Sequence, residues 1–80
     1  MANLKKKRKV VLRHRKQIGD TIRFQRKTAG LTQEKLAEAV DLNPKYLGEI
    51  ERGEKIISIE ALLRIAKALK VPIKVFFEDV

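Results

Sequence analysis

The chain has 80 residues and carries 19 lysines and arginines against 10 acidic residues, a formal charge of +9 at pH 7 that favours a polyanionic partner. Its length suits one small domain, and the lack of cysteine and the single histidine exclude disulfides, thiolate metal sites and a catalytic triad, so we expect neither an enzyme nor a bound cofactor. No apolar run approaches the ~18 residues of a membrane span, and the short run Val10–Leu12 lies between cations, which indicates a cytosolic protein without a secretion signal.

The positive charge is concentrated at the N-terminus. Residues 1–17 hold eight cations and no acid, whereas residues 18–80 hold 11 cations and 10 acids. Blocks of like charge repel and usually stay disordered until they meet an opposite charge. The sequence therefore predicts a flexible basic arm over residues 1–17, followed by one domain over residues 18–80.

The basic arm allows several interpretations. It could be a solubility tail, or a short ordered segment that docks on the domain through Val10–Leu12. The segment Lys5–Val10 also resembles a monopartite nuclear import signal. We favour an arm that wraps a nucleic-acid duplex, because eight cations near phosphates would release counterions and make the affinity depend steeply on salt.

The domain begins with a first predicted helix over residues 18–29, which ends at Gly30 because glycine adopts the left-handed conformation without a Cβ penalty. Thr32 is a suitable N-cap for a second helix that ends near Val40. The sharp turn after it is expected at Asp41, because aspartate tolerates a positive φ better than most residues. The apolar residues of the first helix are Ile18, Ile22, Ala29 and, nearby, Phe24.

Three further helices are expected after this turn. Asn43 is a good N-cap and Pro44 fits the first helical position, which predicts a third helix over residues 44–52. Ser58 caps a fourth helix over residues 59–70, and a short fifth helix can start at Pro72 and place Phe76 in the core. The apolar stripe predicted for the fourth helix consists of Ile59, Leu62, Leu63, Ala66 and Leu69.

This pattern resembles the phage-repressor (Cro/CI-type, Xre) helix-turn-helix family over about Ile18–Phe77. The resemblance implies an all-α fold, a compact five-helix bundle similar to the lambda-repressor domain, whose third helix enters the major groove of DNA. The motifs that carry it are Ile22 and Arg26, Gly30–Glu34, Leu36-Ala37, Asp41-Leu42 and Ile50–Gly53.

The resemblance also implies a role for individual residues. Lys45, Tyr46 and Glu49 are expected to read bases, since lysine donates to guanine, glutamate accepts from cytosine N4 and tyrosine packs on a thymine methyl. Arg26 and Glu51 match a structural pair that ties the first helix to the third. The remaining residues expected at the DNA or on the outward side of the third helix are Thr32, Gln33, Asn43, Pro44, Gly48 and Arg52, together with Lys5, Lys6, Lys7 and Arg8 of the arm.

We therefore expect a sequence-specific transcriptional regulator, a repressor or autoregulator, that binds a palindromic double-stranded site as a homodimer. Its expected location is the cytoplasm of a bacterial or phage-type system, on the nucleoid. The sequence does not separate a phage-type repressor from a restriction–modification controller or an antitoxin with a small protein partner. A protein-binding adaptor with the same fold would also fit the sequence, as would a non-specific polyanion binder. The expected dimer surface consists of the spare apolar residues Ile56, Ile57, Ile73, Phe77 and Val80.

Overall fold

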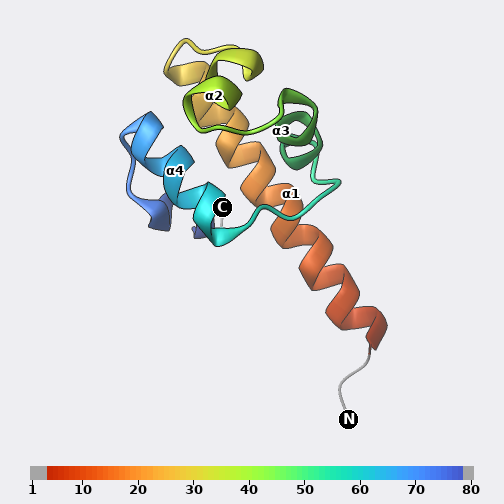
Figure 1. Ribbon diagram of the computed structural model, residues 1–80. Coiled ribbons are helices and arrows are strands. Elements are labelled where there is room, and N and C mark those ends of the chain that lie inside the picture. Colours follow the sequence, from red (N-terminus) through yellow and green to blue (C-terminus); the bar gives the residue numbers. More distant parts are fainter. Residues whose placement is uncertain (1–3, 79–80) are drawn as a thin grey trace.

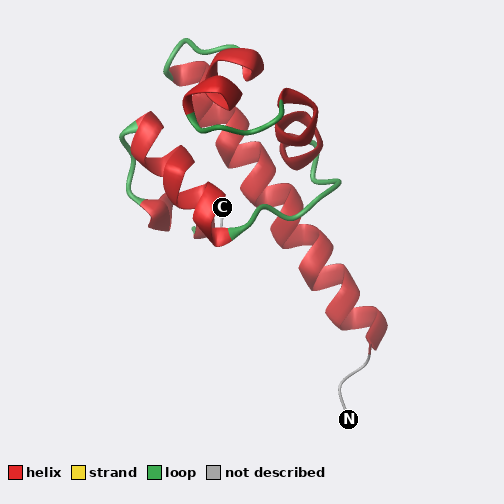
Figure 2. Ribbon diagram, viewed as in Figure 1, coloured by secondary structure: helices red, strands yellow, loops and turns green. Residues whose placement is uncertain are grey.

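The computed structural model describes the backbone of residues 4–78 and the side chains of residues 12–78. Helices alone make up the regular structure of this part of the chain, which confirms the predicted all-α class (Figures 1 and 2). The helices are α1 (Leu4–Thr28), α2 (Gln33–Ala39), α3 (Pro44–Glu51), α4 (Ile59–Leu69) and the 3₁₀ helix η1 (Ile73–Phe77). Within the described residues, none of them is long and apolar enough to span a membrane.

The first helix is much longer than expected. It begins at Leu4 rather than at residue 18, so residues 4–17 of the predicted arm are the N-terminal part of α1. These residues include no glycine, proline or short polar side chain that competes with helical hydrogen bonds. Extending an existing helix is also cooperative, and this effect outweighs the charge repulsion on which the predicted flexible arm was based. We call residues 4–13 the N-terminal extension, because Figure 1 shows α1 running past the other helices at this end.

The predicted helix boundaries agree with the capping contacts. Thr32 accepts a hydrogen bond from the backbone N–H of Lys35 at 3.1 Å, and Ser58 accepts one from Ala61 at 3.1 Å. Asp41 has a φ of 58°, as expected for the turn between α2 and α3. Where a short fifth helix was expected after Pro72, the chain forms the 3₁₀ helix η1, so the structure has four α-helices in its described part. Local side-chain chemistry therefore fixes where α2 and α4 start.

The core lies between α1, the α2–α3 pair, α4 and η1. On α4, the buried face includes Ala61 and Ile65, whereas Ile59 and Leu63 are 61% and 50% exposed, so their prediction as part of the buried stripe was wrong. The i and i+4 spacing of Ile59 and Leu63 fits a helix face equally well, and only the neighbouring helices decide which face is covered. The buried apolar residues are Ile18, Ile22, Leu36, Ala37, Val40, Leu47, Ile50, Ile57, Ala61, Leu62, Ile65, Ala66, Leu69 and Phe76.

Several further expectations about apolar residues need correction. Phe24 is 66% exposed and does not help α1 to pack, and Ala29 is also exposed. Ile57, expected on a dimer surface, is buried in the core, and Ile73 is partly buried against it. Phe76 is fully buried, as predicted. The remaining residues of the expected dimer surface are Ile56 and Phe77, which are exposed, and Val80, which lies outside the described residues.

Gly19 sets the distance between α1 and α3, a role that the sequence pattern did not predict. A Cβ atom at this position would lie 2.2 Å from the backbone oxygen of Ile50 and 2.8 Å from that of Glu51. Only glycine therefore lets α1 approach the C-terminal end of α3 this closely. The crossing at Gly19 fixes the orientation of α3 on the rest of the domain.

Candidate DNA-binding surface

Two short helices and a tight turn form the centre of the candidate site. Ala37 is fully buried in α2, and its backbone oxygen accepts a hydrogen bond from the N–H of Leu42 at 2.8 Å, which closes the turn before α3. Leu47 and Ile50 hold one face of α3 on the core, with relative exposures of 0% and 1%. The opposite side of α3 begins with the exposed Pro44 and Lys45 on a rigid support, which is the geometry that a helix needs to enter a major groove.

The N-terminal part of α3 is the most accessible part of this face. Asn43, Pro44 and Lys45 are all exposed. The Asn43 side chain accepts a hydrogen bond from the backbone N–H of Lys45 at 2.8 Å, so it caps α3 as predicted. The Lys45 ammonium makes no ion pair among the residues whose side chains are described. It is therefore available to a partner in solution.

The other two residues expected to read bases are less accessible. Tyr46 is half-buried, packs against the core, and donates its hydroxyl hydrogen bond to the backbone oxygen of Ile56 at 3.2 Å. The Glu49 side chain is 19% exposed, and its Oε1 lies 3.6 Å from Nζ of Lys55. Both side chains are thus held in place by the loop that follows α3. Each side chain therefore offers only part of its surface to a partner.

Gly48 does not lie on the outward surface, contrary to the expectation from the sequence. It is buried, and a Cβ atom there would lie 3.1 Å from Nη1 of Arg52 and 3.5 Å from Oε1 of Gln33. These two side chains cross over the middle of α3 and cover the glycine. The outward surface at this point is therefore made by Gln33 of α2 and by Arg52 at the end of α3.

Arg52 is oriented by an exposed ion pair with Glu54. Its Nε donates to Oε2 of Glu54 at 2.8 Å, and its Nη2 donates to Oε1 at 3.3 Å. Hydrogen bonding raises the pKa of Arg52 and lowers the pKa of Glu54 from their ordinary values. Because the Nε–Nη2 edge of the guanidinium is engaged, Nη1 is the group left to face Gly48 and solvent.

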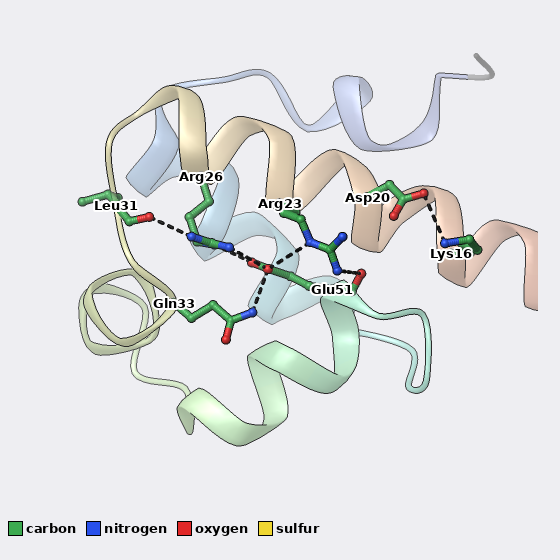
Figure 3. Close-up of polar contacts among 7 residues, drawn as sticks. All are labelled: Lys16, Asp20, Arg23, Arg26, Leu31, Gln33 and Glu51. Atoms are coloured by element: carbon green, nitrogen blue, oxygen red, sulfur yellow. Dashed lines mark hydrogen bonds and ion pairs between the residues drawn. The ribbon is translucent and has the colours of Figure 1, made fainter.

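The predicted pair of Arg26 and Glu51 is present and buried (Figure 3). Arg26 donates from Nε to Oε2 of Glu51 at 2.7 Å and from Nη2 to Oε1 at 3.0 Å. Its Nη1 donates to the backbone oxygen of Leu31 at 2.8 Å. Hydrogen bonding to Glu51 raises the pKa of Arg26, although burial acts in the opposite direction. This pair ties α1 to the end of α3.

The same carboxylate holds two further side chains that the sequence pattern did not connect to it. Gln33 donates from Nε2 to Oε1 of Glu51 at 2.9 Å (Figure 3). Arg23 donates from Nη2 to the backbone oxygen of Glu51 at 3.2 Å, and its Nε lies 3.7 Å from Oε1. Arg23 stands three residues before Arg26, so helical spacing could have placed both on one side of α1. Glu51 of α3 is thus the common acceptor for side chains of α1 and α2.

The candidate residues of the basic arm fall largely outside what the structure describes. Lys5, Lys6, Lys7 and Arg8 belong to α1 by their backbone, but their side chains lie outside the described residues. Among the described cations of this region, Arg13 and Lys16 are exposed, and Nζ of Lys16 lies 3.7 Å from Oδ2 of Asp20. Thr32, the remaining candidate, is exposed and caps α2.

Comparisons with known proteins confirm the resemblance seen in the sequence. A regulator of Sinorhizobium medicae, named only as an uncharacterized HTH-type transcriptional regulator, is 34% identical over 62 residues, which cover 78% of this chain and 45% of that protein. The restriction-modification controller protein C.AhdI from Aeromonas hydrophila has a TM-score of 0.76 and 33% identity, covering 79% of this chain and 96% of that chain. The clp gene regulator ClgR from Corynebacterium glutamicum has a TM-score of 0.77 and 36% identity, and the match covers 80% of this chain and 68% of that chain.

The chain spans about half the length of the curated relatives it matches. The family model described as helix-turn-helix (HTH_3) matches residues 22–76, which include all of α2, α3 and α4. This match covers more than half of the sequence. The chain therefore belongs to the helix-turn-helix (HTH_3) family.

Proposed function

We propose that the protein is a sequence-specific DNA-binding transcriptional regulator that places α3 in the major groove. The observation that carries this proposal is the arrangement of α3, with one face buried on the core and the opposite face led by the exposed Lys45. The buried carboxylate of Glu51 fixes that helix to α1 and α2. The relatives support the proposal by name, since they are transcriptional regulators and a restriction-modification controller.

Within this function, base readout is assigned to the N-terminal half of α3. Lys45 is suited to donate to guanine, the outward part of Glu49 to accept from cytosine N4, and the ring of Tyr46 to pack on a thymine methyl. The starts of α2 and α3 are also assigned to the DNA-facing surface. They carry Thr32, Asn43 and Pro44. Arg52 and Gln33 are assigned to the sugar–phosphate backbone, whose contacts position a protein without reading sequence.

A homodimer on a palindromic site completes the proposal. Two copies would place their α3 helices about 34 Å apart, one turn of DNA. The surface assigned to the second copy is a groove of about 330 Å³ lined by residues of α1, the loop before α4, and η1. Ile56 and Phe77 at this groove are 55% and 52% exposed, which supports an interface there. The groove residues are His14, Gln17, Ile18, Ile56, Phe76 and Phe77.

The match to C.AhdI covers 96% of that chain. This similarity favours a function like that of a small restriction-modification controller. A regulator of this kind binds DNA without converting it, so we assign the protein no catalytic role. Its place of action would be the cytoplasm, on the nucleoid.

Selection of bound duplexes from a random DNA pool tests this function. We expect a palindromic consensus, and Lys45→Ala should relax the preference at one position of each half-site at a cost of about 1–3 kcal/mol. Lys67→Ala, an exposed cation on α4, serves as the matched control and should leave the consensus unchanged. A pool without enrichment would contradict the proposal and would point to a protein-binding adaptor or a non-specific polyanion binder.

A further inference from the structure

We infer that the N-terminal extension is a rigid helical arm that binds the phosphates of the duplex flanking the site read by α3. This inference rests on the proposed function. It differs from a flexible arm in one respect that can be measured, because a rigid helix holds its charges at a fixed distance and direction from α3. Three features support it: how α1 is anchored, where it leaves the domain and how its cations are spaced along the helix.

The direction of the extension is fixed by the packing of α1 on α3. The helix runs without a break from Leu4 to Thr28. It crosses the end of α3 at Gly19, where the backbone oxygens of Ile50 and Glu51 leave no room for a Cβ atom. Arg26 and Arg23 then bind Glu51 further along the same helix. A helix anchored at several points cannot pivot freely, so its projecting end keeps its orientation.

The extension leaves the domain beside the C-terminal end of α3. A Cβ atom at Gly53 would lie 3.0 Å from the Cα atom of Lys16, so α1 passes directly over the residue that follows Arg52. The N-terminal end of α1 runs clear of the other helices (Figure 1). The principal extents of the molecule, 44 × 23 × 20 Å, reflect this projection. A duplex that contacts Arg52 would therefore lie near the base of the extension.

The charge of the extension points to phosphate as its ligand. In the sequence, Lys5, Lys9 and Arg13 of the extension, and Lys16 just after it, follow the i, i+4, i+8 and i+11 spacing of one helix face. At 1.5 Å per residue this row is roughly 17 Å long, about five base pairs at 3.4 Å per base pair along one strand. Cations at this spacing also destabilise their own helix, because like charges repel at i, i+4 and because cations are unfavourable at the positive N-terminal end of the helix dipole. A row of phosphates would relieve both effects.

A lipid surface or a second helix fits this segment less well. Leu4 and Val11 share a face at i and i+7, but Arg8 and Arg15 occupy the same face at i+4 and i+11. The apolar stripe needed for a membrane-surface helix or a coiled coil is therefore interrupted by cations. Two extensions of the same charge would also repel one another.

A proline within the extension tests the inference without changing its charge. Leu12 is exposed and precedes the first core residue, so Leu12→Pro should break the helix and leave the domain folded, and Leu12→Ala is the matched control. The probes are the selected consensus duplex alone and the same duplex with ten further base pairs of arbitrary sequence on each side. The wild type and Leu12→Ala should bind the longer duplex on the order of tenfold more tightly, a gain that shrinks as salt rises. Leu12→Pro should lose most of this gain and keep its affinity for the short duplex.

Each different outcome has a separate meaning. If Leu12→Pro gains as much from the flanks as the wild type, the extension acts as a flexible arm and the inference is wrong. If no variant gains from the flanks, the extension does not bind them, which also overturns the inference. Both of these results leave the consensus and the short-duplex affinity intact. Failure of the proposed function is recognised separately, because no consensus would then be selected.

Discussion

The two parts of α1 show how one continuous helix can depend on two different sources of stability. From His14 onward the helix packs on α3 and η1, with Ile22 fully buried and Arg26 paired to Glu51. The N-terminal extension is strongly positive, as expected of a segment that binds a polyanion, and it runs clear of the domain. Substitutions in the packed part should therefore change stability, whereas substitutions in the extension should change DNA affinity.

The largest expected effect comes from Glu51→Ala. This change leaves the buried guanidinium of Arg26 without its partner and also frees Gln33 and Arg23. Breaking a buried ion pair by removing one partner costs about 3–5 kcal/mol, enough to unfold a domain of this size. Chemical denaturation of the purified variant measures the loss. A destabilisation below about 1 kcal/mol would show that the cluster does not hold α1 to α3.

Gly19→Ala should destabilise the protein by roughly 1–3 kcal/mol, because the new Cβ would collide with the backbone of α3. The sign of this effect is informative. In an uncrowded helix interior the same substitution stabilises by about 0.5–1 kcal/mol. Thermal unfolding distinguishes the two cases, and a raised melting temperature would mean that α1 and α3 do not approach as closely as described.

The sequence predicted features that are decided locally and missed those that depend on how helices cross. The caps at Thr32, Asn43 and Ser58 follow from side-chain chemistry within a few residues. The roles of Gly19 and Gly48 appear only once α1 lies on α3 and Gln33 reaches over it. The length of α1 was missed for a different reason. It depends on a balance between helix propagation and charge repulsion, and the sequence does not show which of the two is larger.

Leu12→Ala should change the free energy of unfolding by less than about 0.5 kcal/mol, as is usual for an exposed residue. Ile22→Ala, on the packed part of the same helix, is the control and should cost about 2–5 kcal/mol. Both variants are compared by denaturant unfolding. Equal losses would contradict the division of α1 into a packed part and an extension.

The smallest expected effect concerns pH. Hydrogen bonding to Arg52 lowers the pKa of Glu54 in the folded protein. A carboxyl whose pKa is lowered stabilises the fold above its unfolded pKa, and this contribution disappears as the pH falls through the folded pKa. Since both side chains are about half exposed, the change should be slight. A pH titration of Glu54→Gln beside the wild type measures it, and identical acid profiles would show that the pair is not formed in solution.

The central claim is that the outward face of α3 binds DNA, and amide chemical shifts measured with and without the selected duplex test it most directly. The account predicts the largest changes at residues 43–46 and at Gln33, with little change on the exposed α4 face that carries Ile59 and Leu63. Changes confined to the N-terminal extension, with α3 unaffected, would show that the protein binds DNA only through its charge and would contradict the account.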